Sequence, residues 1–302
     1  MNLVVSHWSA SPLVVAACAA ATAVHLLGAR GLAADARRAR RAMPHGLARE
    51  AVAFYVGTLA VVLALVSPIG YWAQRFVWVR SGQDVLLAVI APALIVLGAP
   101  WLPLRRGLER AGRDGRRERQ VPEESVNVAE EARRWLRLPI AVTVGFNVAW
   151  CGWHLPVLYD AARAQRVVFA CEVITYLGLG VMFWLQLIGS RPYAPGLAPL
   201  RRVVLVVGTA VVSSGLAMVL VFSSAVLYPG YEGGQHHVLG LVADQQVGGA
   251  ALWVIMLVPY SVAIVALLIR WLNTEESADL AAGLDRLLKP AGPAWPSRPG
   301  LR

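Results

Sequence analysis

The sequence is poor in charge and in reactive motifs. Only 15% of its 302 residues are charged, against about 25% in a typical soluble domain. Its single lysine, Lys289, follows the last apolar stretch, which excludes a retinal Schiff base inside a membrane helix. The sequence has no CxxC pair, no phosphate-binding loop and no evident nucleophile–base pair, so we expect no zinc or redox site and no enzymatic activity.

What the sequence has instead is a series of long apolar stretches. Apolar residues make up 57% of it, and stretches of about 18 residues are long enough to cross a hydrocarbon core of roughly 30 Å. No basic residue precedes the first stretch, as a cleaved signal peptide would require, so we interpret it as a retained helix. The pattern predicts an all-α membrane bundle of seven transmembrane helices at 11–28, 50–67, 84–104, 136–158, 167–189, 203–227 and 248–271.

Basic residues fall into alternate gaps between these stretches. Of the 28 Lys and Arg residues, 24 lie in the gaps after the first, third and fifth stretches or from Arg270 onward. The positive-inside rule therefore predicts an outer N-terminus and a cytoplasmic C-terminus in a bacterial plasma membrane. This distribution explains the net charge of +10 without a nucleic-acid partner, and the basic inner face would attract anionic membrane lipid.

The predicted organisation is one membrane domain and one tail. The seven-helix domain covers 1–272 and contains a charged cytoplasmic loop at 105–135, which we expect to be a solvated, partly helical hairpin. The cytoplasmic tail, 273–302, begins with a plausible helix start and becomes Pro-rich, which predicts a helix followed by disorder.

The predicted topology gathers an unusual set of polar residues at the outer face. Gln83 and Asp84 are expected to open the third helix, and His154 to close the fourth. Their companions are Arg80, Asp160, Glu172, His236, His237, Asp244, Gln245 and Gln246. Simple structural roles account for several of them, because an acid at a helix start caps free N–H groups. Asp84 and Asp244 fit that role, and the two loop histidines fit a solvated pair.

Glu172 does not fit a capping role. It lies inside an apolar run, where burying a carboxylate costs at least about 2.5 kcal/mol on insertion scales. We expect it to face the bundle interior with a partner, for which His154 and Arg166 are available on the same side. Cys151 and Cys171 lie near these residues in the sequence, and thiol with imidazole would suit Cu(I). The alternative is that both cysteines are small buried apolar residues.

An ordered series of motifs runs from about residue 54 to residue 276. It comprises Ser67-Pro68, Ala91-Pro92, Gly98-Ala99-Pro100, Trp153-His154-Leu155-Pro156, Tyr159-Asp160, Phe183-Trp184, Leu227-Tyr228-Pro229, Tyr231, Asp244-Gln245-Gln246, Gly248-Gly249 and Trp253. The series resembles the multi-span CtaG-type cytochrome c oxidase assembly proteins. The resemblance implies a role in maturing a haem-copper oxidase, with oxidase subunits as partners and copper handled at the outer face.

The resemblance also implies two histidine pairs, which this sequence lacks. Family members carry His-Met-x-Gln-His and His-x-x-Glu-His, and the histidine positions are Arg80, Asp84, Phe169 and Val173 here. An Arg and an Asp four residues apart can pair across one helical turn and replace a metal clamp with an ionic one. Either copper is held differently, through His154, Glu172 and Asp244 with help from His236, His237 or a cysteine, or copper is not bound. We favour the second interpretation.

Three functions follow from these patterns. The leading hypothesis is an oxidase assembly factor that assists copper-site maturation or acts as a chaperone scaffold. The second is a small-molecule or ion transporter with Glu172 on its path, since intramembrane acids often mark such paths. The third is a structural subunit of a respiratory complex.

Overall fold

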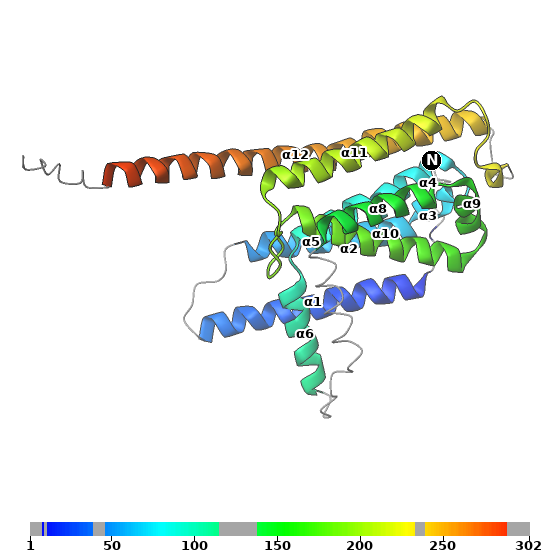
Figure 1. Ribbon diagram of the computed structural model, residues 1–302. Coiled ribbons are helices and arrows are strands. Elements are labelled where there is room, and N and C mark those ends of the chain that lie inside the picture. The colour runs from blue at the N-terminus through cyan, green and yellow to red at the C-terminus, as the bar shows by residue number, and fades with distance from the viewer. Residues whose placement is uncertain (1–7, 9–10, 39–45, 115–137, 233–238, 289–302) are drawn as a thin grey trace, which may run out of the picture.

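All regular structure in the described part of the chain is helical, which confirms the all-α prediction. The computed structural model describes residues 8, 11–38, 46–114, 138–232 and 239–288. Most of the helices run along one common direction (Figure 1). In chain order they are α1 (Pro12–Arg38), α2 (Leu47–Val66), α3 (Pro68–Ala73), α4 (Val77–Val85), the π-helical η1 (Leu86–Ile90), α5 (Ala91–Leu97), α6 (Trp101–Asp114), α8 (Pro139–Trp153), α9 (Pro156–Ala164), α10 (Arg166–Leu187), α11 (Pro199–Phe222), the 3₁₀ turn η2 (Pro229–Tyr231) and α12 (Leu241–Leu288).

The long helices correspond one to one to the predicted spans. Six are long and apolar enough to cross a membrane, with the α4–η1–α5 segment counted as one, and the bent pair α8–α9 would make a seventh. The chain is therefore built as a polytopic membrane protein. We call the end of the bundle at which α4, α10 and α12 begin the polar end. The opposite end, at which α5 and α10 end and α11 begins, is the arginine-rich end.

The third span does not begin where the sequence predicted. Its helix starts at Val77 and ends at Leu97, so the predicted bounds of 84–104 are wrong. The apolar residues before Arg80 extend the helix toward the polar end, and Asp84 lies inside it rather than at its start. This segment is also the most enclosed of the spans, with 67% of its apolar window buried against 11–33% for the other five long helices.

A π turn interrupts the centre of this span. Pro92 has no backbone N–H and cannot donate to the carbonyl of Ala88, one helical turn earlier. The helix widens at η1, directly before Pro92, as π turns commonly allow. Gly180 of α10 packs against this point, since a Cβ there would lie 2.4 Å from the Ala88 carbonyl oxygen. Only glycine permits this close approach between the two helices.

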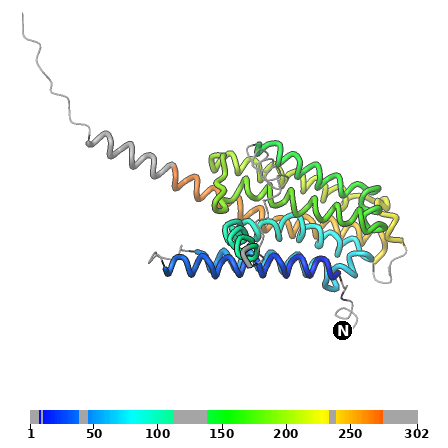
Figure 2. The backbone as a smooth tube through the Cα atoms, turned by 90° about the horizontal axis from the view of Figure 1, so that it is seen from below, coloured from blue at the N-terminus to red at the C-terminus, as the bar shows by residue number. Residues whose placement is uncertain are grey.

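A sharp turn separates α5 from α6. Ala99 adopts a left-handed conformation with φ of 40° before Pro100, so the helix cannot continue to residue 104 as predicted. The amphipathic helix α6 then crosses α1 (Figures 1 and 2). At the crossing, a Cβ on Gly28 would lie 1.7 Å from the Pro103 carbonyl oxygen. The prediction that the 105–135 loop is partly helical is confirmed for 105–114, and 115–135 lies outside the described residues.

The fourth span is bent rather than straight. Helices α8 and α9 meet at an angle of 72°, with the break between Trp153 and Pro156. Pro156 cannot continue the hydrogen-bond ladder of α8, and it disfavours helical geometry at Leu155. The single helix predicted over 136–158 is therefore wrong. The bend turns α9 across the polar end of the bundle (Figure 1).

The last helix continues far beyond the bundle. Helix α12 runs without a break from Leu241 to Leu288 and packs along α11 (Figure 1). The predicted helical start of the tail is thus the continuation of the last membrane helix and not a new element. The end of the tail, 289–302, lies outside the described residues.

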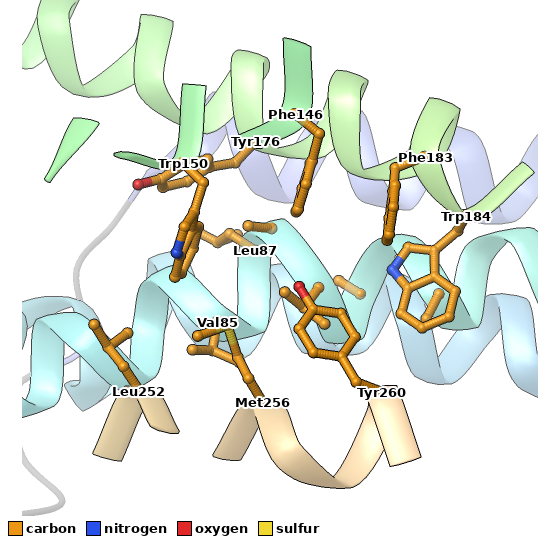
Figure 3. Close-up of a cluster of buried hydrophobic side chains, with 14 of the residues drawn as sticks. Val85, Leu87, Phe146, Trp150, Tyr176, Phe183, Trp184, Leu252, Met256 and Tyr260 are labelled. Atoms are coloured by element: carbon orange, nitrogen blue, oxygen red, sulfur yellow. The ribbon is translucent and has the colours of Figure 1, made fainter. Parts of the chain in front are cut away.

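Large aromatic side chains fill the core around the central span. Phe146 and Phe183 stack face to face with their ring centroids 4.8 Å apart. Trp150, Trp184 and Tyr260 approach the same core from α8, α10 and α12 (Figure 3). The central span is thereby held from several sides, and its polar residues are fixed in the protein interior.

Candidate functional site

The centre of the candidate site is the guanidinium group of Arg80. Arg80 lies one turn into α4 and is 1% exposed. Its Nε lies 3.1 Å from Asp84 Oδ1 on the next turn of the same helix, and its Nη2 donates to Glu172 Oε2 of α10. The predicted pairing of Arg80 with Asp84 is confirmed, but the pair is buried and not exposed. We call these three residues with His154 the Arg80 cluster.

The cluster sets two carboxyl groups against one guanidinium group. Removing a charge from water is costly unless the charge is paired. Arg80 Nη1 makes one further contact, a long hydrogen bond of 3.5 Å to Gln83 Oε1. Gln83 in turn donates to the Ala64 carbonyl of α2 at 2.7 Å. The charged groups are therefore bound into a network that joins α2, α4 and α10.

Aromatic rings enclose the guanidinium group. Its carbon lies 4.7 Å from the ring centroid of Phe169 and 5.7 Å from that of Tyr159, distances at which a cation is attracted to an aromatic face. Tyr159 stacks on Tyr228 with centroids 4.2 Å apart, and Tyr231 lies behind it at 5.9 Å. All three tyrosines are buried. Together they cover the Arg80 cluster next to the break between α8 and α9.

His154 lies at the α8–α9 break and faces Asp84. Its Nδ1 is 2.8 Å from the Trp150 carbonyl oxygen, which can only accept, so Nδ1 carries the proton. Nε2 is then left with its lone pair, 3.9 Å from Asp84 Oδ2 and without a hydrogen-bond partner. The hydroxyl of Tyr228 donates to the His154 carbonyl at 2.9 Å and fixes the break. The imidazole is thus held rigidly with one nitrogen available.

Asp244 has a separate role at the same end of the bundle. It is fully buried in the first turn of α12, but it caps α4 instead of its own helix. Its two carboxylate oxygens accept hydrogen bonds from the backbone N–H groups of Val77 at 2.8 Å and Trp78 at 3.2 Å. A negative charge here also complements the dipole of α4. Asp244 therefore fixes the start of the helix that carries Arg80.

The remaining predicted residues hold loops in place. Gln245 accepts from the Leu227 backbone N–H at 2.8 Å. Gln246 Nε2 donates to the Ser223 carbonyl at 3.3 Å, and Asp160 accepts from the Gly230 N–H at 3.1 Å. These contacts tie α9, η2 and the α11–α12 connection to one another. The predicted helpers His236 and His237 lie outside the described residues.

The partner of Glu172 differs from the predicted ones. Glu172 pairs with Arg80, whereas Arg166 is exposed and His154 faces Asp84. The sequence interpretation missed this pair because it placed Arg80 before the start of the third helix. The apolar run at 76–79 was the signal that the helix begins earlier. Tyr176, one turn after Glu172, was also missed, and its hydroxyl lies 3.4 Å from His154 Nδ1.

The donors at the cluster do not fit a copper ion. Copper sites favour imidazole and thiolate ligands. Both carboxylates here bind a permanent cation, and His154 supplies a single imidazole nitrogen. Cys151 is only half-buried, and Cys171 is exposed although the adjacent Glu172 is buried. Within the described part of the chain, no three His, Cys, Asp or Glu residues are arranged to hold a metal.

The cluster occupies the positions at which the family resemblance implies histidines. Three of those four positions, Arg80, Asp84 and Phe169, make contacts around one guanidinium group. The fourth, Val173, packs against the apolar core. A salt-bridged cation therefore stands where the resemblance implies a metal clamp.

Comparisons with known proteins agree with that resemblance. A family described as cytochrome c oxidase caa3 assembly factor (Caa3_CtaG) matches residues 5–274. A relative from Mycobacterium leprae (strain TN), described as "Uncharacterized protein ML1998", is 26% identical over 244 residues. The alignment covers 79% of this chain and 36% of the relative, so the chain spans about a third of the relative's length. No solved structure matches the chain.

Proposed function

The chain belongs to the cytochrome c oxidase caa3 assembly factor family, and from this premise we propose that it assists the maturation of a haem-copper oxidase as a membrane scaffold. In this proposal it does not hold copper at the Arg80 cluster. The observation that carries the proposal is the guanidinium group of Arg80, bound by Asp84 and Glu172 in the place of a metal clamp. Its oxidase contacts would form at the polar end, which we place on the outer face of a bacterial plasma membrane.

The structure of the polar end supports a scaffold role. Arg80, Asp244 and the tyrosines of α9 and η2 fix the helices and loops there through buried hydrogen bonds and ion pairs. A surface held in this way presents one shape to a partner, so less conformational entropy is lost when the partner binds. Such a surface suits a protein that must recognise an immature membrane subunit.

Deleting the gene tests the oxidase role directly. We expect loss of haem-copper oxidase activity while the oxidase polypeptides remain in the membrane, and recovery when the wild-type gene is returned. Full oxidase activity in the deletion strain would reject the assignment. A stoichiometric association with the mature oxidase would instead favour a structural subunit, because an assembly factor should bind immature forms.

The copper content of the purified protein distinguishes a scaffold from a protein that carries copper. We expect no bound copper in wild-type protein purified under reducing, copper-replete conditions. A variant that restores the family histidines, with Arg80→His, Asp84→His, Phe169→His and Val173→His, supplies the matched positive control and should gain copper if it folds. Stoichiometric copper in the wild type that is lost in His154→Ala would reject our proposal. It would favour a site built from His154 with His236, His237 or a cysteine.

A transporter with Glu172 on its path is the runner-up. The buried carboxylate within a membrane helix is the feature that favours it. Its ion pair with Arg80 favours a static role instead. A proteoliposome flux that disappears in Glu172→Gln, while a variant of the exposed residue Arg166 leaves it unchanged, would support transport over scaffolding.

A further inference from the structure

The bundle is tightly closed at its polar end along α12. A Cβ on Gly248 would lie 3.0 Å from Ser81 Oγ of α4. One on Gly249 would lie 2.9 Å from the Ala217 carbonyl oxygen of α11. The two glycines therefore let α12 contact both neighbours closely, and Asp244 adds its cap to α4. Toward the arginine-rich end, a groove opens between α12 and the helices α5 and α10.

An apolar groove of about 310 Å³ lies between α12, α5 and α10 in the other half of the bundle. Its walls are formed mainly by Leu94, Leu97, Trp184, Leu187, Ala263 and Ala266. All three helices belong to membrane spans, so the groove faces the hydrocarbon layer. Leu97 is 47% exposed at its edge, which leaves the groove open from the side.

Positive charge marks one end of the groove. Arg270 of α12 is the charged residue of the described lining. Arg202 of α11 reaches the same end, where its Nη1 donates to the carbonyl of Leu187 at 3.4 Å. The Nε of Arg202 also donates to the Leu197 carbonyl at 2.6 Å, which fixes its guanidinium group at this end. Among the described side chains, neither arginine has a carboxylate within ion-pair distance, so this end of the groove attracts an anion.

We propose that this groove binds one acyl chain of an anionic phospholipid, with its phosphate at Arg270 and Arg202. The walls are apolar where the chain would lie, and the cations are placed where a span ends and lipid headgroups begin. Charge-assisted hydrogen bonds from arginine suit a phosphate oxygen. The two arginines at one end of the groove favour an anionic headgroup over the apolar face of a helix from another subunit. The site lies away from the Arg80 cluster and does not depend on the proposed function.

Two substitutions test the proposed headgroup contact and the proposed acyl-chain groove separately. Arg270→Gln removes a cation, and Ala266→Phe fills the groove. Their matched controls are Arg201→Gln, which removes an exposed arginine on α11, and Val265→Phe, which enlarges a neighbouring lipid-facing side chain of α12. Neither control residue lines the groove. All four proteins are purified in detergent beside the wild type, and those with unchanged helix content and melting temperature are compared.

Native mass spectrometry after titration with phosphatidylglycerol and phosphatidylcholine gives the readout. We expect one tightly bound phosphatidylglycerol in the wild type and in both controls. Arg270→Gln should bind it about tenfold more weakly, as expected for one lost charge-assisted hydrogen bond, and should lose the preference for the anionic lipid. Ala266→Phe should lose the tightly bound phosphatidylglycerol. Equal lipid binding in all five proteins would overturn the proposal.

A photocrosslinker identifies the occupant in the membrane. Placed at Leu94 inside the groove, it should capture phospholipid, whereas at the lipid-facing Val265 it should capture no particular lipid headgroup. Capture of an oxidase subunit at Leu94 would replace the lipid by a protein partner and overturn the proposal. If Ala266→Phe fails to fold, Arg270→Gln and the crosslink at Leu94 still decide the matter.

Discussion

The two ends of this bundle use charge in opposite ways. At the polar end, Arg80 is buried and its charge is bound by Asp84 and Glu172. At the arginine-rich end, Arg105 and Arg270 are exposed to solvent or lipid. The first arrangement is costly to form and rigid once formed, whereas the second costs little and stays open to ligands. The difference predicts that the same change of charge has a large effect at one end and almost none at the other.

The largest effect should come from Arg80→Met. This variant leaves Asp84 and Glu172 buried without a cation, and breaking a buried pair in this way typically costs about 3–5 kcal/mol. Reversible unfolding in mixed detergent and SDS micelles measures the loss. Arg166→Met, which removes an exposed arginine from the start of α10, is the matched control and should leave the stability unchanged. A loss below about 1 kcal/mol for Arg80→Met would mean that the cluster does not hold the polar end together.

Neutralising the whole cluster sharpens this result. Adding Asp84→Leu and Glu172→Met to Arg80→Met removes the uncompensated charges, and apolar replacements of similar volume for buried ion pairs are often nearly neutral in stability. We expect the triple variant to recover most of the loss. If it is as unstable as the single variant, shape and hydrogen bonding at Arg80 matter more than its charge.

Asp244→Ala should have the next largest effect. It leaves the backbone N–H groups of Val77 and Trp78 without their acceptor, and the loss of a helix cap costs up to about 2 kcal/mol. Because the cap comes from α12, hydrogen exchange should increase at the start of α4 rather than in α12. Asp244→Asn keeps one acceptor oxygen and should lose less. Increased exchange confined to α12 would contradict the assigned cap.

The presence and order of the spans were predictable from the sequence because burial in lipid needs an apolar run that composition reveals directly, whereas the bounds of the third span were not. The pairing of Arg80 with Asp84 was also predictable, since their spacing of four residues puts both on one helix face. The partner of Glu172 was not, because it depends on where α4 begins, and Asp244 of α12 sets that start from far along the chain. The bend at Pro156 was signalled locally, but its 72° angle depends on how Tyr228 holds the break.

A smaller effect is expected at the arginine-rich end from Ser190→Ala. The hydroxyl of Ser190 donates to the Val96 carbonyl and accepts from Trp101 Nε1, both at 2.7 Å, and so ties α5 to α6. Removing it should cost about 1 kcal/mol, the usual net value of one hydrogen bond. Hydrogen exchange should increase at the start of α6, where Trp101 loses its acceptor. A loss as large as that of Arg80→Met would show that the two ends are equally rigid.

The smallest effect should come from Glu109→Gln on α6. A hydrogen bond from Arg105 lowers the pKa of the Glu109 carboxyl, with weaker help from Arg106. A lowered pKa in the folded protein adds stability above the pKa of the unfolded chain, and this stability is lost as the pH falls through the folded value.

Because the Glu109 ion pairs are exposed, solvent and salt screen them. The melting temperatures of wild type and Glu109→Gln should therefore coincide at pH 7 and change together on acidification to pH 4. If the wild type melts at a higher temperature than Glu109→Gln at pH 7 but not at pH 4, ionised Glu109 stabilises the folded protein. Charged residues at the arginine-rich end would then also stabilise the fold, and the two ends would differ only in the size of that effect.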